Sequence, residues 1–138
     1  MKIRAYRPGD EDGIIQLWTE CGLVRSWNDP AKDIRRKLQV NPEWFLVGED
    51  ENGLIASCMV GYDGHRGWIN YLAVRPDKRR QGFARLMVRH AESQLEKAGC
   101  PKINLQIRTS NKEAIRFYEK IGYATDEVIS MGKRLIPD

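Results

Sequence analysis

The chain has 138 residues, of which 41% are hydrophobic and 30% charged, and its formal net charge at pH 7 is +4. This length suits one buried core, so we expect residues 1–138 to form a single domain. No stretch approaches the ~20 apolar residues of a membrane-spanning helix, and the first residues lack the apolar run of a signal peptide. Three widely spaced cysteines without a Cys-x-x-Cys pair argue against a disulfide framework or a zinc site, and favour a cytoplasmic protein without a metal.

The first third of the sequence predicts one strand followed by two helices. A short strand over Ile3–Tyr6 ends at Pro8-Gly9-Asp10, and Asp10 is suited to cap a helix that continues to Gly22. Asp29-Pro30 is a typical helix start, with a capping carboxylate followed by proline at the first helical position. We expect both helices to precede the main sheet.

The middle of the chain predicts a three-stranded antiparallel meander. Apolar, β-rich runs over 44–49 and 54–62 are separated by Asn52-Gly53, a pair that favours a hairpin turn. A polar, glycine-rich turn over 61–67 then leads into a third strand over 68–74.

A strand, a charged loop and a helix follow one another between Trp68 and Met87. Apolar residues recur at helical spacing after Gly82, where the first backbone N–H groups of a helix lack partners and attract anions. The segment 75–89 contains six cations and one anion, a net of +5, so the other residues sum to −1. This local excess of positive charge favours a polyanionic ligand at the loop.

The last third predicts a helix, a strand, a second helix and one or two final strands. The first helix ends at Gly99, and Lys102–Arg108 alternates as a strand parallel to the 68–74 strand. Ser110 and Glu113 match a capping box that starts the next helix, and 128–135 is strand-like. The order β-α-α-β-β-β-α-β-α-β describes an α/β (α+β) fold with a mixed, mostly antiparallel central sheet flanked by helices.

Two sequence blocks resemble signatures of the GNAT superfamily of N-acetyltransferases. Residues 79–84 (Arg-Arg-Gln-Gly-Phe-Ala) match the Arg/Gln-x-x-Gly-x-Gly/Ala acetyl-CoA signature, and 111–123 match Asn-x-x-Ala-x-x-Phe-Tyr-x-x-x-Gly-Phe/Tyr. The resemblance extends over nearly the whole chain, and the predicted fold is also similar to that of bacterial ribosomal-protein N-terminal acetyltransferases. It implies an enzyme that moves an acetyl group from acetyl-CoA to a primary amine by direct attack.

The resemblance also implies roles for individual residues. Tyr118 would be the general acid that protonates the departing thiolate, and Asn111 would contact the cofactor near its thiol. A backbone N–H near Leu72 would polarise the acetyl carbonyl. The residues implied to bind acetyl-CoA are Leu72, Ala73 and Val74 along the pantetheine arm and Arg79, Arg80, Gln81, Gly82, Phe83 and Ala84 around the pyrophosphate.

The general base and the acceptor are less well defined by the sequence. His65, in the 62–66 turn, has an intrinsic pKa suited to a base acting through water, although an exposed turn histidine is the plainer interpretation. Asp63 is an alternative that would orient an ammonium group, and Trp27 and Tyr62 could form the wall of an acceptor pocket. Glu20 and Glu49 are weaker candidates for the base.

Two other functions compete with catalysis. The chain could be a catalytically reduced CoA-binding regulatory module, which the presence of both Asn111 and Tyr118 disfavours. RNA binding through the basic loop is disfavoured because no series of stacking aromatic residues accompanies the charges. The expected partner is therefore an amine acceptor, either a small molecule or a protein N-terminus, with no nucleic acid or membrane, and a homodimer is left open.

Overall fold

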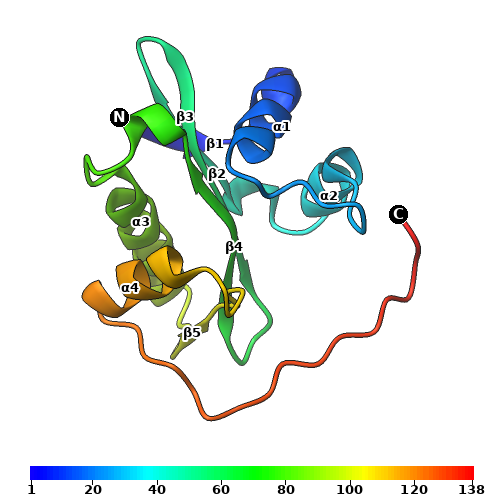
Figure 1. The fold of residues 1–138 in the computed structure, drawn as a ribbon, viewed down its shortest axis with the longest axis vertical. Helices are drawn as coiled ribbons and strands as arrows, with labels where there is room; N and C mark the ends of the chain where they lie inside the picture. Colours follow the sequence, from blue (N-terminus) through cyan, green and yellow to red (C-terminus); the bar gives the residue numbers. More distant parts are fainter. The chain divides into compact units, whose positions relative to one another are not determined.

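A computed structural model describes residues 1–138 (Figure 1), and the chain divides into two units. The first comprises residues 1–104 together with Asp138, and the second comprises residues 105–137. No helix combines the length and the apolar character that a membrane span requires.

The first unit is built on a five-stranded sheet whose strands lie in the order in which they occur in the chain. The strands are β1 (Lys2–Ala5), β2 (Phe45–Asp50), β3 (Gly53–Tyr62), β4 (Gly67–Val74) and β5 (Ile103–Asn104). Neighbours from β1 to β4 are antiparallel, and β5 runs parallel to β4. The predicted meander and the predicted parallel return strand are therefore confirmed, although β5 is much shorter than the predicted 102–108.

Three α-helices accompany this sheet, with α1 and α2 on one side and α3 on the other (Figure 1). They are α1 (Glu11–Glu20), α2 (Pro30–Lys37) and α3 (Phe83–Lys97), and short 3-10 helices cover 8–10, 42–44 and 76–78. The predicted start of α2 is confirmed, because the Asp29 carboxylate accepts hydrogen bonds from the N–H groups of Ala31 and Lys32.

Asp10 occupies the position before α1, but its side chain does not cap the helix. It accepts two hydrogen bonds from the Arg4 guanidinium, at 2.8 and 2.9 Å, and one from the Arg7 N–H at 2.8 Å. The bonds from Arg4 hold the pKa of the Asp10 carboxyl below its usual value. Asp10 therefore ties the start of α1 to β1.

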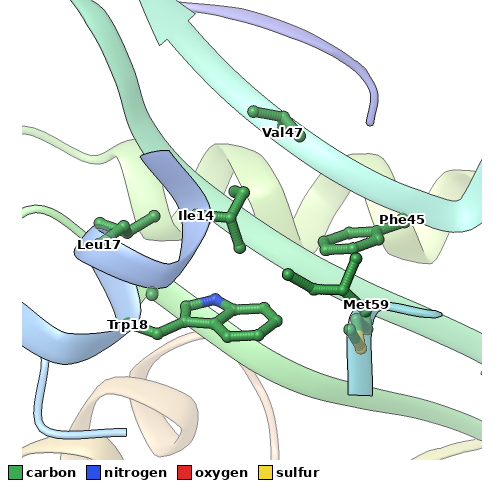
Figure 2. Packing of buried hydrophobic residues seen from close by; sticks show 8 residues of the cluster. Ile14, Leu17, Trp18, Phe45, Val47 and Met59 are labelled. Carbon is green, nitrogen blue, oxygen red and sulfur yellow. The ribbon is translucent and has the colours of Figure 1, made fainter. Parts of the chain in front are cut away.

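The core between the sheet and α1–α2 is rich in aromatic rings. Figure 2 shows the indole of Trp18 lying among Ile14, Leu17 and Met59. Its ring stacks on Tyr71, with centroids 3.9 Å apart, and Trp18 itself is fully buried. The other buried members of this cluster are Ile34, Phe45, Val47 and Ala73. On α3, four residues are buried: Met87, Val88, Ala91 and Leu95.

The second unit contains α4 (Lys112–Lys120). Its N-cap is Asn111 instead of the predicted Ser110, because the Asn111 Oδ1 accepts a hydrogen bond from the Ala114 N–H at 3.1 Å. The predicted final strands are absent, since no strand follows α4. A β-rich sequence becomes a strand only where its backbone pairs, and in this structure Val128, Ile129 and Met131 are exposed.

Candidate active site

The site begins at a β-bulge in β4. Ser57 of β3 pairs with Ala73 and Met59 pairs with Asn70, so Cys58 alone lies opposite both Tyr71 and Leu72. Tyr71 has φ +52°, a left-handed conformation that is uncommon for a residue with a bulky side chain. The extra residue of a bulge is left out of the regular ladder, so backbone groups here are available for other partners.

A buried pair of side chains holds the bulge from the α1 side. The Trp18 Nε1–H donates to the Ser57 Oγ at 2.9 Å, and the Ser57 hydroxyl donates to the Tyr71 carbonyl at 3.0 Å. Both side chains belong to residues with no solvent exposure. The carbonyl of Tyr71 is thus fixed by a side chain on the neighbouring strand.

A second group of polar side chains holds the phenol of Tyr71. Its hydroxyl donates to the Asp33 carboxylate at 2.6 Å and accepts from the Asn28 Nδ2 at 2.6 Å. Burial and the adjacent Asp33 raise the pKa of the Tyr71 phenol, which therefore stays neutral and keeps its proton. The Asp33 side chain is 25% exposed, so this cluster borders solvent. Sequence reasoning assigned no role to the side chains of Tyr71, Asp33 and Ser57.

The strand that contains the bulge leads directly into the charged loop. Leu72 is half-buried, Ala73 and Val74 are buried, and the 3-10 turn over 76–78 follows. Arg80 and Gly82 both have left-handed backbones, with φ +65° and +83°. Glycine adopts this left-handed conformation without strain, and no atom lies within 4 Å of a Cβ built on Gly82.

The first turn of α3 carries neither a capping side chain nor an acidic residue. Its leading N–H groups therefore face outward without a carboxylate or hydroxyl to satisfy them, as an anion-binding helix start requires. Gly82, Phe83 and Ala84 supply this end, and Gln81 is exposed beside it. A helix start of this kind is suited to bind an anion such as a phosphate.

Some cations of the loop form ion pairs with carboxylates, and others are free of such pairs. Arg75 forms a two-pronged ion pair with Asp77 at 2.8 Å, and Lys78 pairs with Asp50 at 3.5 Å. The Arg79 Nε–H donates to the Val74 carbonyl at 3.2 Å, which orients its exposed guanidinium at the end of β4. Arg79 and Arg80 are therefore better suited to meet phosphate than Arg75 or Lys78.

The second sequence block lies in the other unit. Asn111 uses its Oδ1 to cap α4, which leaves its amide N–H₂ as a donor. Tyr118 is the buried residue of α4, and its ring makes edge contacts with Phe117 and Tyr123 at centroid distances of 5.0 and 5.3 Å.

The turn between β3 and β4 contains the residues predicted as base candidates. His65 is exposed there, and about 13 Å of strand separates Gly67 from the bulge at Tyr71, at ~3.3 Å per residue. The Asp63 carboxylate accepts hydrogen bonds from the N–H groups of His65 and Arg66 and from the Trp68 indole. These bonds lower the pKa of Asp63 to about 2 and commit its oxygens to the turn.

The remaining predicted residues lie apart from the bulge or have other partners. Glu49 forms an ion pair with Arg4, and the Tyr62 hydroxyl donates to the Gly99 carbonyl at 3.4 Å. Trp27 is 52% exposed in the loop before α2. Glu20 lines a cavity of about 700 Å³, whose lining includes Gln16, Leu54 and Arg75 but none of the predicted cofactor-binding residues.

Comparison with known proteins shows which family the chain belongs to. Residues 12–123 match the acetyltransferase (GNAT) family. Over 138 residues the chain is 47% identical to an acetyltransferase of Yersinia enterocolitica and 47% identical to one of Pectobacterium atrosepticum, covering 100% of this chain and 98% of each relative.

Solved structures share the fold. Ard1 from Thermoplasma volcanium has a TM-score of 0.80 at 24% identity, covering 89% of this chain and 82% of that one. The ribosomal-protein-S18-alanine N-acetyltransferase of Escherichia coli has a TM-score of 0.72 at 22% identity, covering 88% and 76%. On the family match and the full-length relatives, the chain belongs to the acetyltransferase (GNAT) family and is an acetyl-CoA-dependent acetyltransferase.

Proposed function

We propose that this acetyltransferase moves the acetyl group of acetyl-CoA directly to a primary amine, with residues 1–138 acting as one catalytic domain. The observation that carries the proposal is the continuity of β4 with α3. A bulge whose backbone leaves the regular strand pairing leads within ten residues into an uncapped helix start flanked by exposed arginines. The thioester and the pyrophosphate, which lie at the two ends of the pantetheine arm of acetyl-CoA, need these two features.

The cofactor would lie along this path. The N–H groups at 82–84, with Arg79, Arg80 and Gln81, would bind the pyrophosphate, and the backbone of Leu72, Ala73 and Val74 would hold the pantetheine arm. Asn111 would donate its free amide N–H₂ near the thiol. The left-handed Gly82 supports this assignment, because the space where a Cβ would stand is open.

The chemical step requires an acid and an oxyanion donor. The amine nitrogen attacks the thioester carbon, the carbonyl oxygen takes up negative charge against the Leu72 N–H, and the C–S bond then breaks. Tyr118 would give its phenolic proton to the leaving thiolate, and the nitrogen would lose a proton to water or a base. A phenol suits this role because it retains its proton well above pH 7.

The acceptor side would be formed by Asn28, Asp33 and Tyr71. The partly exposed Asp33 carboxylate, one tyrosine ring away from the bulge, would receive an ammonium group before its deprotonation in place of its exposed ion pair with Arg36. Deprotonating a lysine-type amine at pH 7 costs on the order of 4.6 kcal/mol, against about 1 kcal/mol for an α-amine. We therefore favour an acceptor with an α-amine, such as a protein N-terminus. The Escherichia coli neighbour, named for the alanine of ribosomal protein S18, supports this class.

His65 stays a proposed base that acts through water. Its distance from the bulge along β4 exceeds the reach of a single water, so this role requires a chain of water molecules. The three cysteines are unpaired, which supports action in the cytoplasm.

Two measurements test the proposal. We expect acetyl-CoA to raise the melting temperature of the pure protein, and we expect release of free CoA when the protein is mixed with acetyl-CoA and N-terminal peptides, amino acids, polyamines or aminoglycosides. Mass spectrometry of the acceptor identifies the acetylated nitrogen. Stabilisation without CoA release for any amine would instead support a regulatory CoA-binding module, and no stabilisation at millimolar acetyl-CoA would refute both.

A further inference from the structure

The peptide unit between Tyr71 and Leu72 links the buried core to the proposed oxyanion donor. A trans peptide is planar, and its C=O and N–H point in opposite directions. The structure contains no cis peptide bond. Whatever fixes the direction of the Tyr71 carbonyl therefore fixes the direction of the Leu72 N–H.

The Ser57 hydroxyl is the group that fixes this carbonyl. It donates to the Tyr71 oxygen at 3.0 Å from the neighbouring strand, at the point where the bulge interrupts the regular pairing of β3 with β4. The orientation of the hydroxyl is set in turn by the Trp18 Nε1–H, which donates a hydrogen bond to the Ser57 Oγ at 2.9 Å. The relay runs from the Trp18 N–H through the Ser57 O–H to the Tyr71 carbonyl.

The relay is fully buried. Ser57 and Trp18 have no exposed surface, so water does not compete for these hydrogen bonds. In such surroundings successive hydrogen bonds polarise one another, and a peptide whose carbonyl accepts a strong bond has a more acidic N–H. The relay can thus both aim the Leu72 N–H and strengthen it as a donor.

The backbone, the ring and the hydroxyl of Tyr71 are each held in place. Its backbone has φ +52°, its ring is stacked on Trp18 with planes 15° apart, and its hydroxyl is held by Asp33 and Asn28. A conformation this uncommon persists only where its surroundings impose it, and such sites concentrate near chemistry.

We propose that Ser57 and Trp18 are positioning residues for catalysis, which hold the Tyr71–Leu72 peptide so that its N–H stabilises the oxyanion of the acetyl group. Neither side chain touches the substrate. This inference rests on the proposed function, because it requires acetyl-CoA to lie along β4.

The test compares Ser57→Ala with the wild type on two reactions. We expect kcat for amine acetylation to fall ~10-fold, less than the 10²–10³ that loss of a whole oxyanion donor costs, because the donor is misdirected but still present. Slow hydrolysis of acetyl-CoA in the absence of amine should fall by the same factor, while the KM for acetyl-CoA and for the amine stay within about twofold. Trp18→Phe, which keeps an aromatic ring but removes the N–H, should show a smaller fall of the same kind.

A spectroscopic measurement separates positioning from a merely structural role. Bound acetyl-CoA labelled with ¹³C at its carbonyl should show a C=O stretch at lower frequency than in solution, and Ser57→Ala should reverse most of that shift. The matched control is Val60→Ala, on the same strand and equally buried, which loses packing without touching the bulge. It should lower the melting temperature and leave kcat and the carbonyl frequency unchanged.

The outcomes are distinguishable. Wild-type turnover in Ser57→Ala, or equal losses of kcat in Ser57→Ala and Val60→Ala, would overturn the positioning role while leaving the acetyltransferase proposal intact. Failure of the wild-type protein to bind acetyl-CoA would instead remove the proposed function, and this inference with it.

Discussion

The Tyr71 hydroxyl donates a hydrogen bond of 2.6 Å to the Asp33 carboxylate, which joins the bulge of β4 to helix α2. Asp33 also lies 3.3 Å from the Arg36 guanidinium, so the carboxylate is oriented from two sides. The contact connects the strand proposed to hold the thioester with the segment proposed to receive the amine. A change at either residue should therefore affect the acceptor more than the cofactor.

Tyr71→Phe tests this relationship because it keeps the ring stacked on Trp18 and removes only the hydroxyl. We expect the free energy of unfolding to fall by about 1–2 kcal/mol, as for a lost hydrogen bond that leaves a partly buried partner. The KM for the amine should rise several-fold, and the affinity for acetyl-CoA should stay unchanged. Asp33→Asn, which retains an acceptor oxygen for Tyr71 but loses the charge, should raise the amine KM with a smaller loss of stability. Equal changes in both KM values would contradict an acceptor role.

Gly82→Ala tests the proposed pyrophosphate site. Gly82 and Gly99 flank the two ends of α3 with nearly the same left-handed backbone, at φ +83° and +86°, and neither has an atom within 4 Å of a built Cβ. Alanine at either position should cost about 1 kcal/mol of stability through backbone strain. Only at Gly82 would the new methyl group meet the phosphate, so calorimetry should show acetyl-CoA affinity falling tenfold or more in Gly82→Ala and remaining unchanged in Gly99→Ala. Equal acetyl-CoA affinities in the two variants would show that the pyrophosphate does not bind at Gly82.

The elements that the sequence predicts well are those that depend on local pattern. Apolar, β-rich runs identified β2, β3 and β4, Asp29-Pro30 identified the start of α2, and Gly82 marked the start of α3. Each of these signals involves residues within a few positions of one another, where backbone preference and side-chain capping act directly.

The bulge and its supports depend on residues far apart in the chain, and no local pattern encodes them. Trp18 and Ser57 are separated by 39 positions and Asn28 and Tyr71 by 43. Tyr71 in particular is a residue that local preference would not place in a left-handed conformation. For the same reason the sequence predicted too long a strand for β5 and predicted strands after α4 that do not form. Strand formation there depends on backbone pairing, which the spacing of apolar residues does not reveal.

Asp10→Asn tests the link between β1 and α1 through its pH dependence. The pKa of Asp10 is lowered in the folded protein by Arg4, so the ionised carboxylate contributes stability above the unfolded pKa near 3.9, and this contribution is lost as the pH falls through the folded value. We expect Asp10→Asn to unfold more easily at pH 7 and to lose less stability than the wild type between pH 5 and pH 2. Urea unfolding at several pH values measures both effects. Parallel stability–pH curves for the two proteins would contradict the assignment.

Tyr118→Phe tests the proposed role of Tyr118 as the general acid. Removing the hydroxyl should lower kcat by ~10² or more, because the thiolate would then leave without a proton donor, whereas the KM for acetyl-CoA should change little. Tyr123→Phe is a matched control, because Tyr123 makes an edge contact with Tyr118 and tolerates phenylalanine in the family signature. The loss should also diminish when acetyl-CoA is replaced by an acetyl thioester whose thiol has a much lower pKa, since a better leaving group needs less help from an acid. A loss that is the same for both thioesters would assign Tyr118 to positioning and leave protonation of the thiolate to water.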